Sequence, residues 1–159
     1  MCGISKGVWI DAGCGRGTYT LPLAKLASQV IAIDKNPYDI SFLKAKLSSP
    51  VNIVALEKDF NQEPLFYDLV DGVLFGFSLH YEHSPTKALQ NAFNQLKSNG
   101  IIIIFEYTHE KPLPWVPYPV PKSLSINLLE KIGFREIETI LQDSRFYIIR
   151  GKKSSILLS

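Results

Sequence analysis

A short apolar run that leads into a glycine-dense turn is the feature that most restricts how this chain can fold. Val8 to Asp11 have the pattern of a buried strand, and Gly13, Gly15 and Gly17 follow directly. Glycine suits a tight turn in which the backbone comes close to a ligand, because a side chain would clash there. A helical pattern comes next, and the N–H groups at its start would point at that ligand. The segment therefore predicts a strand, a turn and a helix that together bind a ligand.

Apolar runs alternate with helical patterns along the rest of the chain. Strands are predicted over residues 30–34, 51–56, 69–77 and 101–106, with two more in a hairpin that turns near 142–144. Apolar stripes predict helices through Leu21, Ala24 and Ala27, through Ile40, Leu43 and Leu47, through Leu89, Phe93 and Leu96, and over residues 123–132. Helix boundaries are predicted at Asn36-Pro37, Ser84-Pro85, Asn99-Gly100 and Gly133.

This alternation predicts an α/β fold of the Rossmann-like, doubly wound kind. We expect a mostly parallel seven-stranded sheet with an antiparallel C-terminal strand and helices on both faces. The chain has 159 residues and is 46% hydrophobic, which fits a single domain over residues 1–159 with an ordinary core.

Charge and cysteine content restrict the setting and the partners. A net charge of +2 does not indicate a nucleic-acid or anionic-membrane partner, and the apolar runs are too short to span a bilayer. Cys2 and Cys14 form neither a disulfide framework nor a metal-ligand spacing, so we expect no metal. No charged-then-apolar leader opens the chain, and a cytoplasmic location is the expectation.

Polar residues fall where predicted strands end, namely Asp11, Asp34, Asp59 and the region of His80. In an open parallel sheet, ligands bind beyond the carboxyl ends of the strands. The carboxylate of Asp34 can accept both hydroxyls of a ribose, because it has two adjacent acceptor oxygens. A helix cap is the other reading of Asp34, although Asn36 already fills that role.

Two further acids narrow the kind of ligand. Asp59 can accept from an adenine amino group, with Phe60 beside the base, although alone it would read as an exposed loop acid. Asp11 comes two residues before the first glycine, where it would repel a pyrophosphate. A ligand with an amino group and a positive sulfur would favour an acid there.

Together these motifs resemble the class I S-adenosylmethionine-dependent methyltransferases. Residues 11–17 match the first motif of that family, residues 30–34 its second-strand motif, and residues 59–60 its adenine site. Residues 67–70, 79–81 and 96–101 resemble the branch that includes ubiquinone and menaquinone biosynthesis methyltransferases. The resemblance covers residues 7–153 and concerns the fold and the cofactor more than the substrate.

The resemblance implies S-adenosyl-L-methionine as the cofactor and assigns roles to individual residues. It places Gly13, Cys14 and Gly15 against the methionine part of the cofactor, Asp11 near its amino group, Asp34 on the ribose, Asp59 and Phe60 on the adenine, and Phe75 and Gly76 at the sulfonium. The predicted reaction is transfer of the sulfonium methyl group to an acceptor by in-line displacement.

His80 and Tyr81 follow the fourth predicted strand, where this family places the acceptor, and they are the catalytic candidates. The pKa of a free histidine lies near neutrality, so His80 suits a general base. A hydrogen-bonded structural histidine is the alternative. The proline-rich residues 111–121 form either a rigid connector or a lid wall that carries Trp115 or Tyr118.

The acceptor is not identified by the sequence. No Asn-Pro-Pro-Tyr-type motif follows the fourth strand, which favours a small-molecule or protein acceptor over nucleic acid. One alternative is an NAD-dependent oxidoreductase, but the turn reads G-x-G-x-G with Thr18 where a third glycine or alanine is expected. Another is a non-catalytic or partner-dependent subunit. Few residues precede the first strand, so the expected alternatives are an open acceptor site, a site covered by a homo-oligomer or partner subunit, or a large acceptor.

Overall fold

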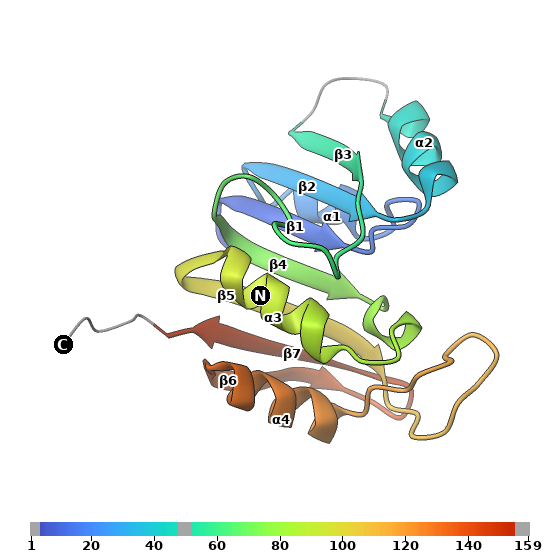
Figure 1. Cartoon of the computed structure of the whole chain (residues 1–159), viewed down its shortest axis with the longest axis vertical. Coiled ribbons are helices and arrows are strands. Elements are labelled where there is room, and N and C mark those ends of the chain that lie inside the picture. Colours follow the sequence, from blue (N-terminus) through green and yellow to red (C-terminus); the bar gives the residue numbers. More distant parts are fainter. Residues whose placement is uncertain (1–3, 48–51, 155–159) are drawn as a thin grey trace.

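Seven strands form one sheet in the order β3-β2-β1-β4-β5-β7-β6 (Figure 1). The computed structural model describes residues 4–47 and 52–154. The strands are β1 (Val8–Ala12), β2 (Gln29–Asp34), β3 (Ile53–Glu57), β4 (Val70–Gly76), β5 (Leu96–Tyr107), β6 (Phe134–Gln142) and β7 (Phe146–Lys153). The first five are parallel, and β7 runs antiparallel to both β5 and β6. The predicted sheet is confirmed, while Val51, in the predicted strand 51–56, lies outside the described residues.

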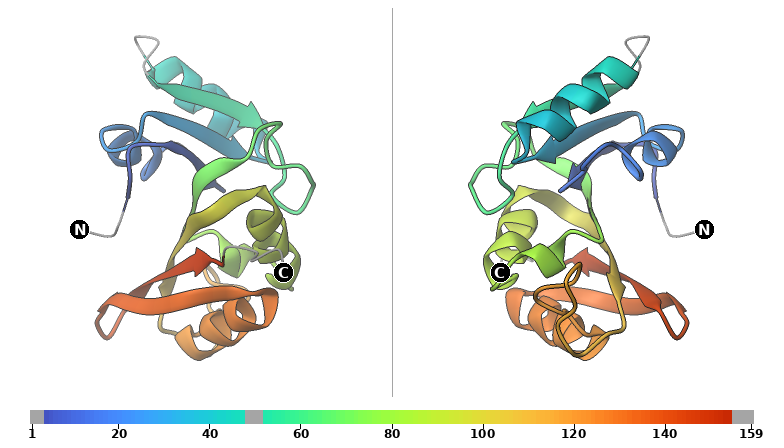
Figure 2. Two further views of the ribbon diagram at one scale, coloured as in Figure 1. Left: turned by 90° about the vertical axis from the view of Figure 1, so that its left-hand side faces the viewer. Right: turned by 90° about the vertical axis from the view of Figure 1, so that its right-hand side faces the viewer.

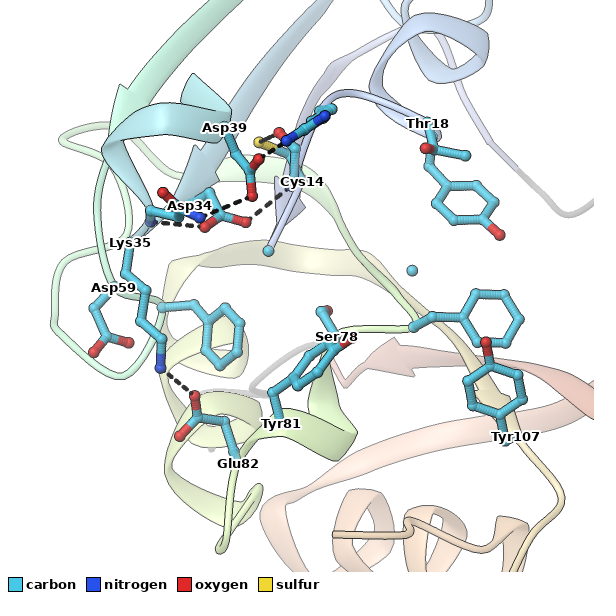
Figure 3. A pocket seen from close by; sticks show the side chains of 18 residues that line it. Cys14, Thr18, Asp34, Lys35, Asp39, Asp59, Ser78, Tyr81, Glu82 and Tyr107 are labelled. Carbon is cyan, nitrogen blue, oxygen red and sulfur yellow. Dashed lines mark hydrogen bonds and ion pairs between the residues drawn. The ribbon is translucent and has the colours of Figure 1, made fainter. Parts of the chain in front are cut away.

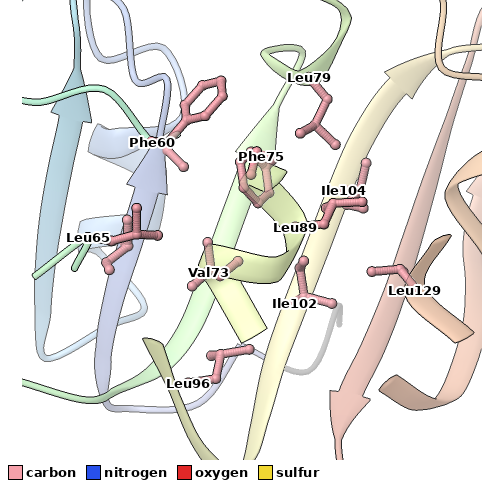
Figure 4. Close-up of a cluster of buried hydrophobic side chains, with 14 of the residues drawn as sticks. Phe60, Leu65, Val73, Phe75, Leu79, Leu89, Leu96, Ile102, Ile104 and Leu129 are labelled. Atoms are coloured by element: carbon pink, nitrogen blue, oxygen red, sulfur yellow. The ribbon is translucent and has the colours of Figure 1, made fainter. Parts of the chain in front are cut away.

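Helices cover both faces of this sheet, as expected. They are α1 (Thr20–Ala24), α2 (Pro37–Lys46), α3 (Thr86–Gln95) and α4 (Lys122–Ile132), with a 3-10 turn, η1 (Leu79–Tyr81), after β4. Figure 2 shows α3 and α4 on one face and α1 and α2 on the other. The larger core cluster lies beneath α3 and α4, where Leu89 and Leu129 meet the inward residues of β4 and β5 (Figure 4). No helix in the described ranges is long and apolar enough to cross a membrane.

The first helix differs from its predicted form. It has five residues, and its buried side chains are Thr20 and Leu23, whereas Leu21 and Ala24 are only half-buried. Thr20 faces inward because its hydroxyl donates to the carboxylate of Asp11 at 2.6 Å. Ala27 is buried in a core cluster with Trp9 and Leu23, and Ala24 packs against that cluster, so the predicted stripe is confirmed at these two positions. It was wrong at Leu21, which is not part of that cluster, because the polar contact of Thr20 takes the inner face of the first turn.

The end of α3 also differs from the prediction. The helix ends at Gln95, and Leu96 begins β5 by pairing with Val70, so Leu96 is not part of a helical stripe. Asn99 adopts a positive φ of 64° within β5 and does not end the helix. Lys153 donates from its Nζ to the carbonyl oxygens of Phe93 and Leu96, both at 2.7 Å. A lysine far along the chain thus satisfies carbonyls that a helix end leaves free.

Asp71 and Gly72 interrupt the apolar run of β4, and each contacts a residue of β1. A Cβ atom at Gly72 would lie 2.4 Å from the Trp9 ring, so glycine is required for the fully buried Trp9 to lie across the sheet. Asp71 accepts from the backbone N–H of Val8 at 2.8 Å. These two contacts hold β1 and β4 together and align their carboxyl ends.

Candidate functional site

A cleft of about 700 Å³ opens beyond the carboxyl ends of the parallel strands. Eight of the residues predicted for the site line it: Gly13, Cys14, Gly15, Asp34, Asp59, Phe60, Gly76 and Tyr81. They come from the ends of β1, β2, β3 and β4 and from η1, so the topology alone brings them together. The position of the cleft agrees with the general rule for open α/β sheets.

The glycine turn forms one wall of the cleft with its backbone. Gly13, Gly15 and Gly17 all have positive φ angles, of 75°, 51° and 88°. A Cβ atom at Gly13 would lie 2.5 Å from the Cβ of Ser78, whereas a Cβ at Gly15 would meet nothing within 4 Å. The turn is therefore closed against the protein at Gly13 and open to the cleft at Gly15.

Asp34 joins the turn to the end of β2. Its Oδ2 accepts from the N–H of Gly15 and its Oδ1 from the N–H of Asn36, both at 2.8 Å. Asn36 in turn caps α2 by accepting from the N–H of Tyr38 at 3.0 Å, as predicted. Each carboxylate oxygen has a second lone pair. Asp34 can thus hold the turn and still accept two hydroxyl groups from a ligand.

The charged side chains that line the cleft are mostly acidic. The lining contains two cations, Arg16 and Lys35, and four carboxylates, those of Asp34, Asp39, Asp59 and Glu82. Both cations are already paired, Arg16 with Asp39 and Lys35 with Glu82, each at 3.1 Å. Figure 3 shows Asp34, Asp39 and Asp59 on one side of the cleft and Tyr107 at its other end. Such a lining favours a cationic ligand over an anionic one.

Asp59 and Phe60 lie just after β3 at the acidic side of the cleft. Asp59 accepts from the N–H of Asn61 through Oδ1 at 2.8 Å, which leaves Oδ2 for a ligand. Phe60 is buried and packs edge-on against Phe75, with ring centroids 5.6 Å apart. Its ring also approaches Gly13, so the predicted adenine residues lie beside the glycine turn.

The opposite end of the cleft is aromatic, and sequence reasoning did not single out its residues. Phe77 lies between Tyr19 and Tyr107, with ring centroids 6.0 and 4.6 Å away. Phe77 has a φ of 56°, an unusual backbone conformation for a bulky residue and one typical of functional sites. Burial raises the pKa of both tyrosine hydroxyls, so they stay protonated at neutral pH.

Three of the predicted site residues do not line the cleft. Phe75 is fully buried and points into the core (Figure 4). Asp11 is 1% exposed, and its carboxylate accepts from the hydroxyl of Thr20. Burial raises the pKa of Asp11 to about 6, and the Thr20 hydrogen bond opposes that shift. The structure therefore places Asp11 beneath the glycine turn. The third predicted site residue that does not line the cleft is His80.

His80 is buried behind the cleft. Its Nδ1 lies 2.8 Å from Oε2 of the fully buried Glu106, whose Oε1 accepts from the N–H groups of Leu79 and His80 at 3.0 and 3.3 Å. Its Nε2 has no hydrogen-bond partner among the described residues. This arrangement is that of a structural histidine. Tyr81, in contrast, is 57% exposed and lines the cleft.

Other residues fix the segment after β4. Ser78 donates from its hydroxyl to the carbonyl of Ala12 at 2.7 Å, which joins the ends of β1 and β4. Tyr118 donates from its N–H to the carbonyl of His80 at 3.0 Å, and neither Trp115 nor Tyr118 lines the cleft. The proline-rich residues 111–121 are thus a connector tied to η1. Ser78 was missed because nothing local in the sequence separates it from its neighbours.

The sheet order, the glycine turn and the acid at the end of β2 define the class of protein: the fold is that of the class I S-adenosylmethionine-dependent methyltransferases. A family model described as a methyltransferase domain matches residues 10–104. The chain therefore belongs to this methyltransferase family.

Individual relatives agree with this assignment. An uncharacterised chloroplastic methyltransferase of Arabidopsis thaliana is 27% identical, with 92% of this chain and 47% of that protein covered. A demethylmenaquinone methyltransferase of Clavibacter sepedonicus is 27% identical, with 67% of this chain and 43% of that protein covered. The chain thus spans less than half the length of these curated relatives.

A solved structure shares the fold at low sequence identity. It is an N-methyltransferase from Bradyrhizobium japonicum in complex with S-adenosyl-L-homocysteine, 17% identical. The TM-score is 0.80, with 95% of this chain and 80% of that one covered.

Proposed function

We propose that the protein binds S-adenosylmethionine in the cleft and transfers its methyl group to an acceptor. The observation that carries this proposal is Asp34, which lines the cleft with free lone pairs while its two oxygens hold the N–H groups of Gly15 and Asn36. An acid at this position suits the two hydroxyls of a ribose. The family assignment supports the same cofactor.

The charge and the shape of the cleft fit this cofactor. S-adenosylmethionine carries a positive sulfur and an amino group, and the cleft has four carboxylates against two paired cations. The space above Gly15 allows a ligand to approach the backbone of the turn. Asp59 and Phe60 would hold the adenine, and Asp34 the ribose.

Once bound, the cofactor supplies a methyl group already activated by the positive sulfur. The chain's contribution is then mainly orientation, which can lower a barrier by ~7–11 kcal/mol when the reacting atoms are held in line. The faces of Tyr19, Phe77 and Tyr107 can attract a cation at their end of the cleft. No histidine is among the described lining residues, so we propose an acceptor that does not depend on a histidine base.

Calorimetric titration with S-adenosyl-L-homocysteine tests the proposal. We expect binding to the wild type and at least tenfold weaker binding to Asp34→Ala, because about 1.4 kcal/mol of lost interaction is a factor of ten. Asp39→Ala is the matched control, since Asp39 also lines the cleft but accepts from the side chains of Arg16 and Asn36 rather than from the backbone of the turn. Absence of binding to the wild type would overturn the proposal.

An NAD-dependent oxidoreductase is the alternative enzyme, and the site argues against it. The acidic lining would repel a pyrophosphate, and no glycine or alanine follows Gly17. Retention of NADH by the purified protein, without affinity for S-adenosyl-L-homocysteine, would reverse this ranking.

The acceptor and the partners belong to the same proposal. We propose a small-molecule or protein acceptor and a cytoplasmic setting, from the absence of a nucleic-acid amino-methylation motif and from the cysteine content. A partner subunit or second copy would cover the acceptor end if the chain needs one for activity. Methyl transfer by the isolated chain would exclude the partner-dependent form.

A further inference from the structure

The segment between β3 and β4 reaches the cleft without any regular structure of its own. Residues 58–69 form neither helix nor strand, yet they carry Asp59 and Phe60 to the acidic side of the cleft. Buried backbone groups outside helices and sheets need partners elsewhere, because leaving them unpaired is costly. The partners of this segment show what determines its position.

Amide side chains on one face of α3 supply those partners. Asn91 donates from its Nδ2 to the carbonyl oxygen of Phe60 at 3.0 Å. One turn further on, Gln95 accepts from the N–H of Phe66 at 3.0 Å and donates to the carbonyl of Asp68 at 2.6 Å. Asn91 and Gln95 are 4% and 5% exposed, so both amides are used inside the protein rather than in solvent.

The two amides hold different ends of the segment. Asn91 holds the end that lines the cleft, at Phe60, whereas Gln95 holds the end that leads into β4. The Phe60 carbonyl is already bound by Asn91, which leaves the Phe60 ring and the Asp59 carboxylate as the groups for a ligand. The position of these two groups therefore depends on a residue that does not itself line the cleft.

We infer that Asn91 is a positioning residue for recognition of the adenine base. The inference rests on the proposed function. By fixing Phe60, Asn91 also fixes the neighbouring Asp59, whose carboxylate accepts from the 6-amino group of adenine and repels the 6-oxo group of hypoxanthine. Loss of the Asn91 hydrogen bond lets both groups shift, so the site loses its discrimination between the two bases. Gln95 has the same chemistry and comparable burial but no such effect.

Calorimetric titration with S-adenosyl-L-homocysteine and S-inosyl-L-homocysteine tests this role in the full chain. We expect the wild type to prefer the adenine compound at least tenfold and Asn91→Ala to prefer it less than threefold. Gln95→Ala is the matched control and keeps the wild-type ratio within twofold, although both variants lower the melting temperature. Loss of stability alone therefore cannot produce the expected pattern.

Other outcomes separate this inference from the proposed function. An Asn91→Ala protein that keeps the wild-type ratio would overturn it, as would an equal loss of discrimination in Gln95→Ala. A wild type that binds both compounds equally would also overturn it while supporting the cofactor. A wild type that binds neither compound contradicts the proposed function itself. If Asn91→Ala does not fold, Asn91→Leu replaces it, because leucine fills the space but cannot donate.

Discussion

The two ends of the cleft present different chemical groups to a ligand. At the acidic end, the protein presents backbone groups of the glycine turn and the carboxylate of Asp34, which are joined by a hydrogen bond of 2.8 Å. At the aromatic end, it presents the rings of Tyr19, Phe77 and Tyr107, which touch one another through ring contacts alone. Backbone geometry allows little substitution, whereas ring contacts allow the surface to change. The two ends therefore differ in how well they should tolerate substitution.

A buried carboxylate lies behind each end, and the two differ in their partners. Asp11, beneath the glycine turn, accepts a hydrogen bond from the hydroxyl of Thr20. Glu106, behind η1, accepts from the N–H groups of Leu79, His80 and Tyr107 and contacts the His80 ring. A carboxylate with several N–H donors is a strong structural anchor, while one with few donors is costly to keep charged.

The largest effect is expected from Gly13→Ala at the acidic end. Its φ of 75° disfavours any side chain, and the new Cβ would lie 2.5 Å from the Cβ of Ser78. We expect at least a hundredfold loss of affinity for S-adenosyl-L-homocysteine by calorimetry, with a lower melting temperature. Gly15→Ala is the comparison, because its Cβ meets no protein atom and it should lose affinity with less loss of stability. Wild-type binding by Gly13→Ala would contradict the rigid-turn account.

Asp11→Asn should change the dependence of stability on pH. Because burial raises the pKa of Asp11 from 3.8 to about 6, the folded state binds more protons than the unfolded state between those values. The stability contribution of Asp11 therefore falls as pH rises from about 4 to about 6. Relative to wild type, Asp11→Asn should gain up to ~3 kcal/mol in free energy of unfolding between pH 4 and pH 7. Urea unfolding at pH 4 and at pH 7 measures the difference in free energy of unfolding between the two proteins. A difference that does not change with pH contradicts the account.

Glu106→Gln tests the anchor behind the aromatic end. The substitution replaces one acceptor oxygen with an NH₂ group that faces donors, so we expect a loss of ~1–3 kcal/mol in stability. Glu110→Gln, an exposed neighbour in the chain, should be neutral in the same urea titrations. Affinity for S-adenosyl-L-homocysteine should stay within about threefold of wild type, since the groups proposed to hold its adenine and ribose lie at the other end. A larger loss would show that the two ends are coupled.

Tyr107→Phe should have the smallest effect. The Tyr107 hydroxyl makes no hydrogen bond within the described part of the chain, and the ring contact with Phe77 at 4.6 Å survives the change. Calorimetry should therefore find an affinity for S-adenosyl-L-homocysteine within twofold of wild type. A tenfold loss of affinity would instead show that the hydroxyl contacts the cofactor. The aromatic end would then bind the cofactor as the acidic end does.

Much of the fold follows from local patterns in the sequence. The parallel strands are short apolar runs, and the cap at Asn36 and the helix end at Gly133 depend on residues within a few positions. The place of Asp34 at the end of β2 was predictable for the same reason. Leu96 was misassigned because its partners, Val70 and Lys153, are distant in the chain.

The sequence by itself determined the glycine turn, the order of strands and helices, and the acids at the strand ends. The tertiary structure decided the burial of His80, because Glu106 on β5 meets it across the fold. It also decided the aromatic end, where Tyr19, Phe77 and Tyr107 come from three separate segments. Turns and caps depend on neighbouring residues, whereas the burial of a side chain depends on whatever the folded chain packs against it.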